Sequence, residues 1–204
     1  MRALCRKNRG GSMGKKYNII YADPPWKFQA YSQKGSLQKS ADCHYSCMQL
    51  EDIQNLPVSE IAASDCVLFL WVTFPLLREG LDTLRQWGFL YKTCAFNWVK
   101  RNKRAESWFM GLGYWTRSCS EICLLGTKGK PKRISKSVPQ ICDARIMEHS
   151  RKPDEIRERI VELCGDLPRI ELFARRQYEG WDCLGNEIDG RDIREALPSL
   201  YSKD

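Results

Sequence analysis

Residues Asp23-Pro24-Pro25-Trp26 place a carboxylate, two prolines and an indole directly after residues 17–22, an apolar stretch typical of a β-strand. Proline fixes φ and donates no backbone hydrogen bond, so the chain must leave the sheet at this point. A carboxylate and a prolyl carbonyl can accept the two hydrogens of an amine, while an aromatic side chain covers the face of its ring. The four residues therefore predict a site for a planar aromatic amine, and adenine with its exocyclic N6 fits this description.

Predicted strands and helices alternate along the rest of the chain. Residues 66–72 are continuously apolar, which is typical of a strand covered on both faces. Pro75 and Pro153 each favour a helix start, and Gly88 and Gly165 favour the ends of the same two helices. Further strands are predicted at residues 93–99, 120–125 and 169–173. This alternation predicts an α/β fold with a doubly wound, mostly parallel sheet, in which ligands bind at the carboxyl ends of the strands.

The chain carries 33 Lys and Arg against 25 Asp and Glu, a formal net charge of +8, and two basic runs hold much of this excess. Residues 100–104 and 128–136 each follow a predicted strand, so in a parallel sheet both lie on the functional rim. They favour contact with nucleic-acid phosphates, although solvated loops also explain them. In residues 101–118, aromatic side chains are interleaved with arginines; they either stack on bases or pack the loop onto the sheet.

With 204 residues, the chain is predicted to form one domain at residues 17–190. We expect residues 1–16 to be a disordered basic segment and residues 191–204 a C-terminal tail. The long polar connection 27–47 could act as a lid over the site. No apolar run approaches the roughly 18 residues that a membrane span needs, and the N-terminus lacks the apolar core of a signal peptide. A cytoplasmic protein is therefore expected.

Ten cysteines are spread along the whole chain, and several fall inside predicted strands. Buried free cysteine behaves as a small hydrophobe, and the cytosol keeps thiols reduced, so we expect reduced cysteines. A zinc site could be built from Cys43, His44 and Cys47, or from Cys119 and Cys123. Neither set has the usual paired CxxC spacing, so we expect no metal.

Further segments follow Asp23-Pro24-Pro25-Trp26 in an order typical of one methyltransferase family. These segments are residues 43–48, 68–73, 98–100, 121–129, 149–155, 170–175, 180–181 and 185–187. Over roughly residues 17 to 190, the chain resembles the permuted (beta-class) N6-adenine methyltransferases related to the catalytic subunit of the messenger-RNA N6-adenosine methyltransferase. The resemblance implies a Rossmann-like methyltransferase fold with circularly permuted motif order and S-adenosyl-L-methionine as methyl donor.

The resemblance also implies roles for individual residues. The Asp23 carboxylate and the Pro24 carbonyl would hold the target amine, and Trp26 would stack on a flipped base. Lys152 precedes a helix start, where a cation is electrostatically unfavourable, and it matches a family lysine that contacts the cofactor carboxylate. The catalytic residues so implied are Asp23, Pro24, Pro25 and Trp26. The cofactor-binding residues so implied are Asp23, Ser150, Lys152, Glu171, Phe173, Arg175, Asn186 and Glu187. The substrate-binding residues predicted here are Tyr45, Lys100, Arg101 and Arg104.

These observations predict an S-adenosylmethionine-dependent methyltransferase that acts on N6 of adenine in nucleic acid. DNA is the expected polymer, because the compact chain lacks the added RNA-binding domains of the eukaryotic relatives and its scale suits a bacterial or phage enzyme. Two alternatives stay open, namely an RNA N6-adenosine methyltransferase and a non-catalytic nucleic-acid-binding partner subunit. A homodimer, or a heterodimer with a related subunit, is compatible with the sequence.

Overall fold

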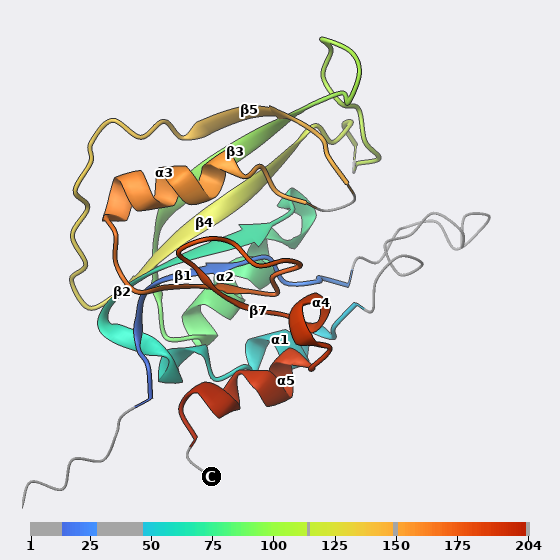
Figure 1. The fold of residues 1–204 in the computed structure, drawn as a ribbon. Coiled ribbons are helices and arrows are strands. Elements are labelled where there is room, and N and C mark those ends of the chain that lie inside the picture. Colours follow the sequence, from blue (N-terminus) through green and yellow to red (C-terminus); the bar gives the residue numbers. More distant parts are fainter. Residues whose placement is uncertain (1–13, 28–46, 114, 149–150, 203–204) are drawn as a thin grey trace, which may run out of the picture.

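The computed structural model describes residues 14–27, 47–113, 115–148 and 151–202 (Figure 1). These residues form one seven-stranded sheet with the strand order β5-β3-β4-β2-β1-β6-β7. The strands are β1 (Tyr17–Ala22), β2 (Ala62–Val72), β3 (Leu90–Arg101), β4 (Ser120–Lys128), β5 (Ile141–Arg145), β6 (Arg169–Leu172) and β7 (Asp182–Leu184). The predicted α/β architecture is therefore confirmed. Strands β3 and β4 extend beyond their predicted ends, because backbone pairing with each other continues past their apolar residues.

Most neighbouring strands of the sheet are parallel. Strand β1 lies between β2 and β6 and is parallel to both, and β7 continues the parallel arrangement beside β6. Strand β4 is the exception, since it runs antiparallel to both β2 and β3. Because β1 and β6 are neighbours, with Ala22 opposite Leu172, the chain segments that follow these two strands begin side by side. The early Asp23–Trp26 motif and the late predicted cofactor strand are thus brought together, as the permuted order implies.

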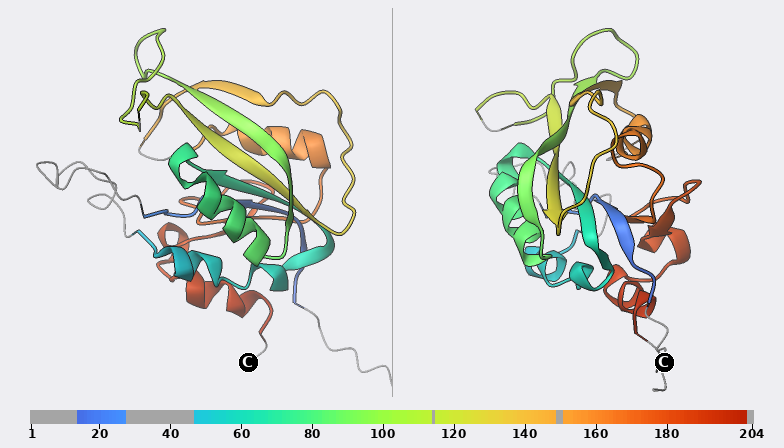
Figure 2. Two further views of the ribbon diagram at one scale, coloured as in Figure 1. Left: turned by 180° about the vertical axis from the view of Figure 1, so that it is seen from behind. Right: turned by 90° about the vertical axis from the view of Figure 1, so that its left-hand side faces the viewer.

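Helices cover both faces of the sheet. The helices are α1 (Leu50–Gln54), α2 (Leu77–Gln86), α3 (Glu155–Cys164), α4 (Asn186–Asp189) and α5 (Ile193–Ala196). Helix α2 lies on one face and α3 on the other (Figure 2). Side chains of β2 alternate between the two hydrophobic clusters: Leu68 and Leu70 pack on the α2 side, Phe69 and Trp71 on the α3 side. This alternation confirms that β2 is a strand covered on both faces.

The helix boundaries follow the predicted glycine and proline signals. Pro75 lies in a 3₁₀ turn that leads into α2, and α3 begins two residues after Pro153. The chain turns after these two helices at Gly88 and Gly165, which have φ values of 84° and 93°. Positive φ favours glycine because it has no Cβ to clash with the backbone.

The second basic run does not lie where the sequence analysis expected it. Strand β4 is antiparallel to β2, and its last residue, Lys128, lies opposite Cys66 near the beginning of β2. Residues 129–136 therefore leave the sheet at the rim opposite the carboxyl ends of β1 and β6. The prediction of two basic loops on one rim is wrong, because it assumed that β4 is parallel to its neighbours. Lys100 and Arg101 belong to β3 itself rather than to the loop that follows it.

The C-terminal residues contribute to the hydrophobic core. Ile193, Ala196 and Leu197 are buried in the same cluster as side chains of α1 and β2. In the described part of the chain, all cysteines are free thiols, and four of them are buried: Cys66, Cys123, Cys142 and Cys164. None of the helices in the described ranges is long and apolar enough to cross a membrane.

Candidate active site

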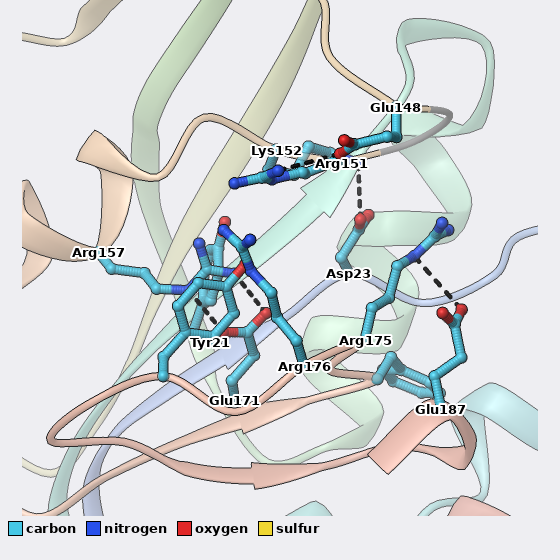
Figure 3. A pocket seen from close by; sticks show the side chains of 12 residues that line it. Tyr21, Asp23, Glu148, Arg151, Lys152, Arg157, Glu171, Arg175, Arg176 and Glu187 are labelled. Carbon is cyan, nitrogen blue, oxygen red and sulfur yellow. Dashed lines mark hydrogen bonds and ion pairs between the residues drawn. The ribbon is translucent and has the colours of Figure 1, made fainter.

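A cavity of about 310 Å³ opens at the carboxyl ends of β1 and β6 (Figure 3). Both aromatic and charged side chains line it, and the charges are of both signs. The lining residues are Tyr21, Asp23, Glu148, Arg151, Lys152, Arg157, Glu171, Phe173, Arg175, Arg176, Tyr178 and Glu187. Such a lining suits a ligand that carries positive and negative groups together.

The turn after β1 holds Asp23 at the edge of this cavity. The backbone N–H of Trp26 donates to the Pro24 carbonyl at 2.8 Å, which closes a tight turn. The indole Nε1 of Trp26 donates to the Trp71 carbonyl of β2 at 2.9 Å, and the N–H of Met48 donates to the Pro25 carbonyl at 3.1 Å. These contacts tie the turn to β2 and to the segment that precedes α1, so Asp23 has a fixed position.

Asp23 is the first member of a row of charges with alternating sign, which we call the charge chain: Asp23, Lys152, Glu121 and Lys100. Lys152 Nζ lies 2.7 Å from Asp23 Oδ2 and 3.2 Å from Glu121 Oε2. Lys100 Nζ donates to the other oxygen of Glu121. The Lys152 side chain is only 6% exposed, whereas Asp23 at the cavity is 21% exposed. The charge chain therefore runs from the cavity into the protein, and its charges compensate each other.

Burial and charge together set the protonation of the charge chain. Burial raises the pKa of Asp23 above its usual value, and the attraction of Lys152 offsets this only in part. Burial also disfavours the Glu121 carboxylate, but Lys152 and Lys100 outweigh it and lower the pKa of Glu121 to about 2. Burial disfavours the Lys152 ammonium as well, yet Asp23 and Glu121 raise its pKa. Glu121 and Lys152 are therefore charged at neutral pH. Of the two carboxylates in the charge chain, Asp23 is protonated first as the pH falls.

A second buried ion pair forms one wall of the cavity. Arg157 of α3 donates from Nε and Nη2 to the two carboxylate oxygens of Glu171, both at 2.6 Å. Both side chains are less than 10% exposed. The guanidinium also lies 3.4 Å from the ring centroid of Tyr178, which adds a cation–π contact. Because Arg157 occupies both oxygens of Glu171, this pair fixes the distance between α3 and β6.

We expect Glu171→Gln to destabilise the folded protein by about 3 kcal/mol, because it leaves the buried Arg157 charge without its partner. The double variant Arg157→Met/Glu171→Leu should recover most of this loss, since it removes both charges. Denaturant unfolding of the three proteins measures the effect. A decrease of less than about 1 kcal/mol in the free energy of unfolding for Glu171→Gln would show that the Arg157–Glu171 pair contributes little to stability.

The segment after β6 has an unusual backbone. Phe173 has φ 63°, a left-handed conformation that is uncommon for a residue with a large side chain. Such strain often occurs where the chain must approach a ligand. The next residue, Ala174, is buried, and its N–H donates to the Leu184 carbonyl at 2.9 Å, so Arg175 and Glu187 lie beside each other. Their side chains are 3.8 Å apart at the cavity mouth (Figure 3).

The cavity brings together six of the residues predicted from the sequence: Asp23, Lys152, Glu171, Phe173, Arg175 and Glu187. Asn186 begins α4 next to them, and Lys100 joins through Glu121. Tyr45 and Ser150 lie outside the described residues. Arg101 binds Asp143 with two hydrogen bonds of 2.7 Å, and Arg104 is exposed in the loop after β3.

Sequence reasoning missed Glu121 and Arg157 as parts of the site. Glu121 lies in a segment that contributed to the resemblance, but its strand gave no indication of which face it occupies. Arg157 follows the predicted helix start, and a basic residue there reads as solvent-exposed. Arg151, Arg176 and Tyr178 were missed in the same way; all three bind Asp154 near the cavity.

The loop between β3 and β4 projects beyond the sheet (Figure 1, upper right). Four of its large apolar side chains are exposed rather than packed onto the sheet, and they are Trp108, Met110, Leu112 and Trp115. Arg101 lies 3.8 Å from the Trp108 ring centroid. Of the two explanations for the aromatics in residues 101–118, packing onto the sheet is therefore wrong for these side chains.

The mostly parallel sheet, the helices on both faces and the cavity at the ends of β1 and β6 define an α/β methyltransferase-like fold. The MT-A70 family matches residues 17–187, and the chain belongs to this methyltransferase family.

Individual relatives agree with this assignment. The chain is 35% identical over 195 residues to the Type II methyltransferase M.MunI of Mycoplasma sp, covering 88% of this chain and 81% of the relative. It is 32% identical over 181 residues to the N(6)-adenosine-methyltransferase catalytic subunit METTL3 of Homo sapiens, covering 86% of this chain but 29% of the relative. For the N(6)-adenosine-methyltransferase MT-A70-like protein of Arabidopsis thaliana, identity is 30% over 189 residues, covering 91% and 26% respectively. The chain thus spans about a quarter of these two eukaryotic relatives.

Proposed function

We propose that this protein transfers a methyl group from S-adenosyl-L-methionine to N6 of adenine in DNA. The observation that carries the proposal is the position of Asp23, which is fixed by the Pro24–Trp26 turn, ion-paired with Lys152 and placed at the edge of the cavity. Membership of the MT-A70 family supports methyl transfer as the reaction. The names of the relatives that are N(6)-adenosine methyltransferases support adenine N6 as the acceptor.

The charges that line the cavity fit those of the proposed cofactor. S-adenosylmethionine carries a carboxylate, an amine, ribose hydroxyls and a sulfonium, and when bound it supplies an electrophilic methyl group. Arg175, Arg151 and Lys152 would attract its carboxylate, and Glu187 would accept hydrogen bonds from its ribose or amine. The left-handed backbone at Phe173 lets the chain approach a ligand closely. In this proposal Asn186 and Ser150 complete the binding residues.

Asp23 would hold and polarise the target amine. Lys152 binds Oδ2, so Oδ1 is the acceptor for one hydrogen of the amine. The Pro24 carbonyl binds the Trp26 N–H but has a second lone pair for the other hydrogen. Two acceptors on one nitrogen favour its tetrahedral form, and the negative charge of Asp23 stabilises the positive charge that develops on it. Trp26, and Tyr45 by resemblance, would cover the faces of the flipped base.

The projecting loop supports a nucleic-acid substrate. It carries exposed Arg104, Lys103 and Arg117 together with exposed Trp108 and Trp115. Basic side chains bind phosphates, and exposed aromatics stack on unpaired bases. The loop follows β3, whose carboxyl end lies at the same rim as those of β1 and β6. Lys100 and Arg101 lie at this rim as well, but their charges are compensated by Glu121 and Asp143.

DNA is proposed as the polymer because the likeness to the Type II methyltransferase extends over most of both chains. The N(6)-adenosine methyltransferases share only a domain-sized part. RNA is the second candidate, since identity to these enzymes is still about 30%. A non-catalytic partner subunit is a weaker candidate, because Asp23 and the whole charge chain are present.

Methyl transfer to different polymers tests the proposal. Duplex DNA, single-stranded DNA and RNA with equal adenine content are offered separately with methyl-labelled S-adenosylmethionine. We expect label in DNA at a rate at least about tenfold above RNA, a difference of about 1.4 kcal/mol in transition-state stabilisation. Equal or greater labelling of RNA would replace DNA by RNA in the proposal.

A further inference from the structure

The segment between β4 and β5 carries a dense positive charge at the rim opposite the cavity. Its residues 128–136, which we call the basic strap, include five cations: Lys128, Lys130, Lys132, Arg133 and Lys136. Between residues 122 and 142 the sequence contains no Asp or Glu. The basic strap follows the left-hand edge of the molecule in Figure 1, beside the C-terminal end of α3.

The backbone of the basic strap is held in place, and four of its five basic side chains are exposed, those of Lys130, Lys132, Arg133 and Lys136. The N–H of Lys130 donates to Asp65 Oδ1 at 2.7 Å, and the N–H of Ile134 donates to the Leu163 carbonyl of α3 at 2.8 Å. The Ser135 hydroxyl donates to Glu162 at 3.3 Å. Asp65 and Glu162 therefore bind a backbone N–H and a hydroxyl group of the strap rather than its cations. The basic strap presents its cations on a fixed frame.

The cations of the basic strap differ from most other cations of the protein. Among the described residues, no carboxylate forms an ion pair with Lys130, Lys132, Arg133 or Lys136. Many arginines elsewhere do face a carboxylate, and they include Arg85, Arg101, Arg151, Arg157, Arg159, Arg169, Arg191 and Arg194. The dipole of α3 attracts cations only at its last turn, so it does not explain five cations in the basic strap. Uncompensated cations that repel one another favour an anionic partner.

We propose that the basic strap is a second phosphate-binding surface, which contacts the backbone of the same nucleic acid whose base enters the cavity. This inference rests on the proposed function. Glu121 in the charge chain and Lys128 in the basic strap are seven residues apart on β4, or about 23 Å at about 3.3 Å per residue. One base pair of DNA occupies about 3.4 Å along the axis, so a duplex that runs along β4 from the charge chain would reach the strap after about seven base pairs. It therefore binds long substrates and does not reach short ones.

The test compares substrate lengths in a strap variant and a matched control. The strap variant is Lys130→Gln/Lys132→Gln/Arg133→Gln, which keeps every backbone donor. The control, Arg85→Gln/Arg191→Gln/Arg194→Gln, removes the same charge from residues that already face a carboxylate. Binding of a hairpin-closed duplex of about 9 base pairs and of an open duplex of about 30 is measured by fluorescence anisotropy across a salt series. KM and kcat for methyl transfer to both duplexes are measured in parallel.

For the 30-base-pair duplex we expect the strap variant to bind about tenfold more weakly. The slope of log affinity against log salt concentration should decrease by the equivalent of about two to three phosphate contacts. Its kcat, and its binding to the 9-base-pair duplex, should match the wild type. The control should remain within about twofold on both duplexes. Equal weakening on both lengths, or wild-type binding to the long duplex, would overturn the inference. Absence of methyl transfer with a normal length effect on binding would instead count against the proposed function.

Discussion

Asp23→Asn is expected to reduce kcat for methyl transfer about 1000-fold. Asparagine keeps the size of the side chain and an oxygen acceptor for the amine. It loses the negative charge that stabilises the cation developing on the target nitrogen, and in a site only partly open to water this charge has a large effect. Lys152 retains Glu121 as its partner, so the fold should persist. Single-turnover transfer of a labelled methyl group measures the change.

Two controls separate chemistry from folding for Asp23→Asn. Thermal unfolding should show a native-like transition, and affinity for S-adenosylmethionine by calorimetry should change less than about tenfold. A variant that keeps more than about a tenth of the wild-type kcat would show that the Asp23 charge is not needed for methyl transfer. The site would then have to be sought elsewhere along the cavity.

Changes to the two neighbours of Asp23 are expected to move the acid limb of the pH–rate profile in opposite directions. The ionised form of Asp23 is the active one, so the rate rises with pH through its pKa. Lys152→Met removes the cation that lowers the pKa of Asp23, so the acid limb should move to higher pH. Glu121→Gln removes a nearby negative charge that raises this pKa, so the acid limb should move to lower pH. At neutral pH, Lys152→Met should lose about 100-fold in kcat/KM.

The measurement is kcat/KM against pH for the wild type and both variants. Lys152→Met leaves two buried carboxylates facing each other, so its folded fraction must be checked by thermal unfolding. The double variant Lys152→Met/Glu121→Gln removes both charges, and its acid limb should lie between those of the single variants. Shifts of the same sign in both single variants would contradict the electrostatic role of the charge chain.

The layout of the fold was largely predictable from local patterns. The apolar run in β2 predicts a strand, because its side chains are buried on both faces of the sheet. The Ile156–Ile160 stripe of α3 predicts a helix, because helical spacing places both side chains in one hydrophobic cluster. The direction of β4 was not predictable in this way. The apolar composition of a strand does not indicate its direction in the sheet, and the antiparallel pairing of β4 depends on its connection to β3. This one reversal moved the second basic run to the opposite rim.

The site was predictable where a residue type is costly without a ligand or partner, and less so elsewhere. Asp23 draws attention because two prolines and an indole follow it at a strand end, and Lys152 because a cation is electrostatically unfavourable before a helix start. Glu121 and Arg157 do not, because an acid in a strand or a basic residue on a helix is ordinary at the surface. Their partners, Lys152 and Glu171, come from distant segments, and only the folded sheet brings them together.

The identity of the methylated nucleoside decides whether this protein methylates N6 of adenine. Duplex DNA is incubated with wild-type protein and methyl-labelled S-adenosylmethionine, digested to nucleosides and separated by chromatography with mass detection, with Asp23→Asn as the matched control. We expect labelled N6-methyladenine with the wild type and none above background with Asp23→Asn. Label in N4-methylcytosine would contradict the assignment of adenine, and no labelled nucleoside from DNA or RNA would contradict methyl transfer itself.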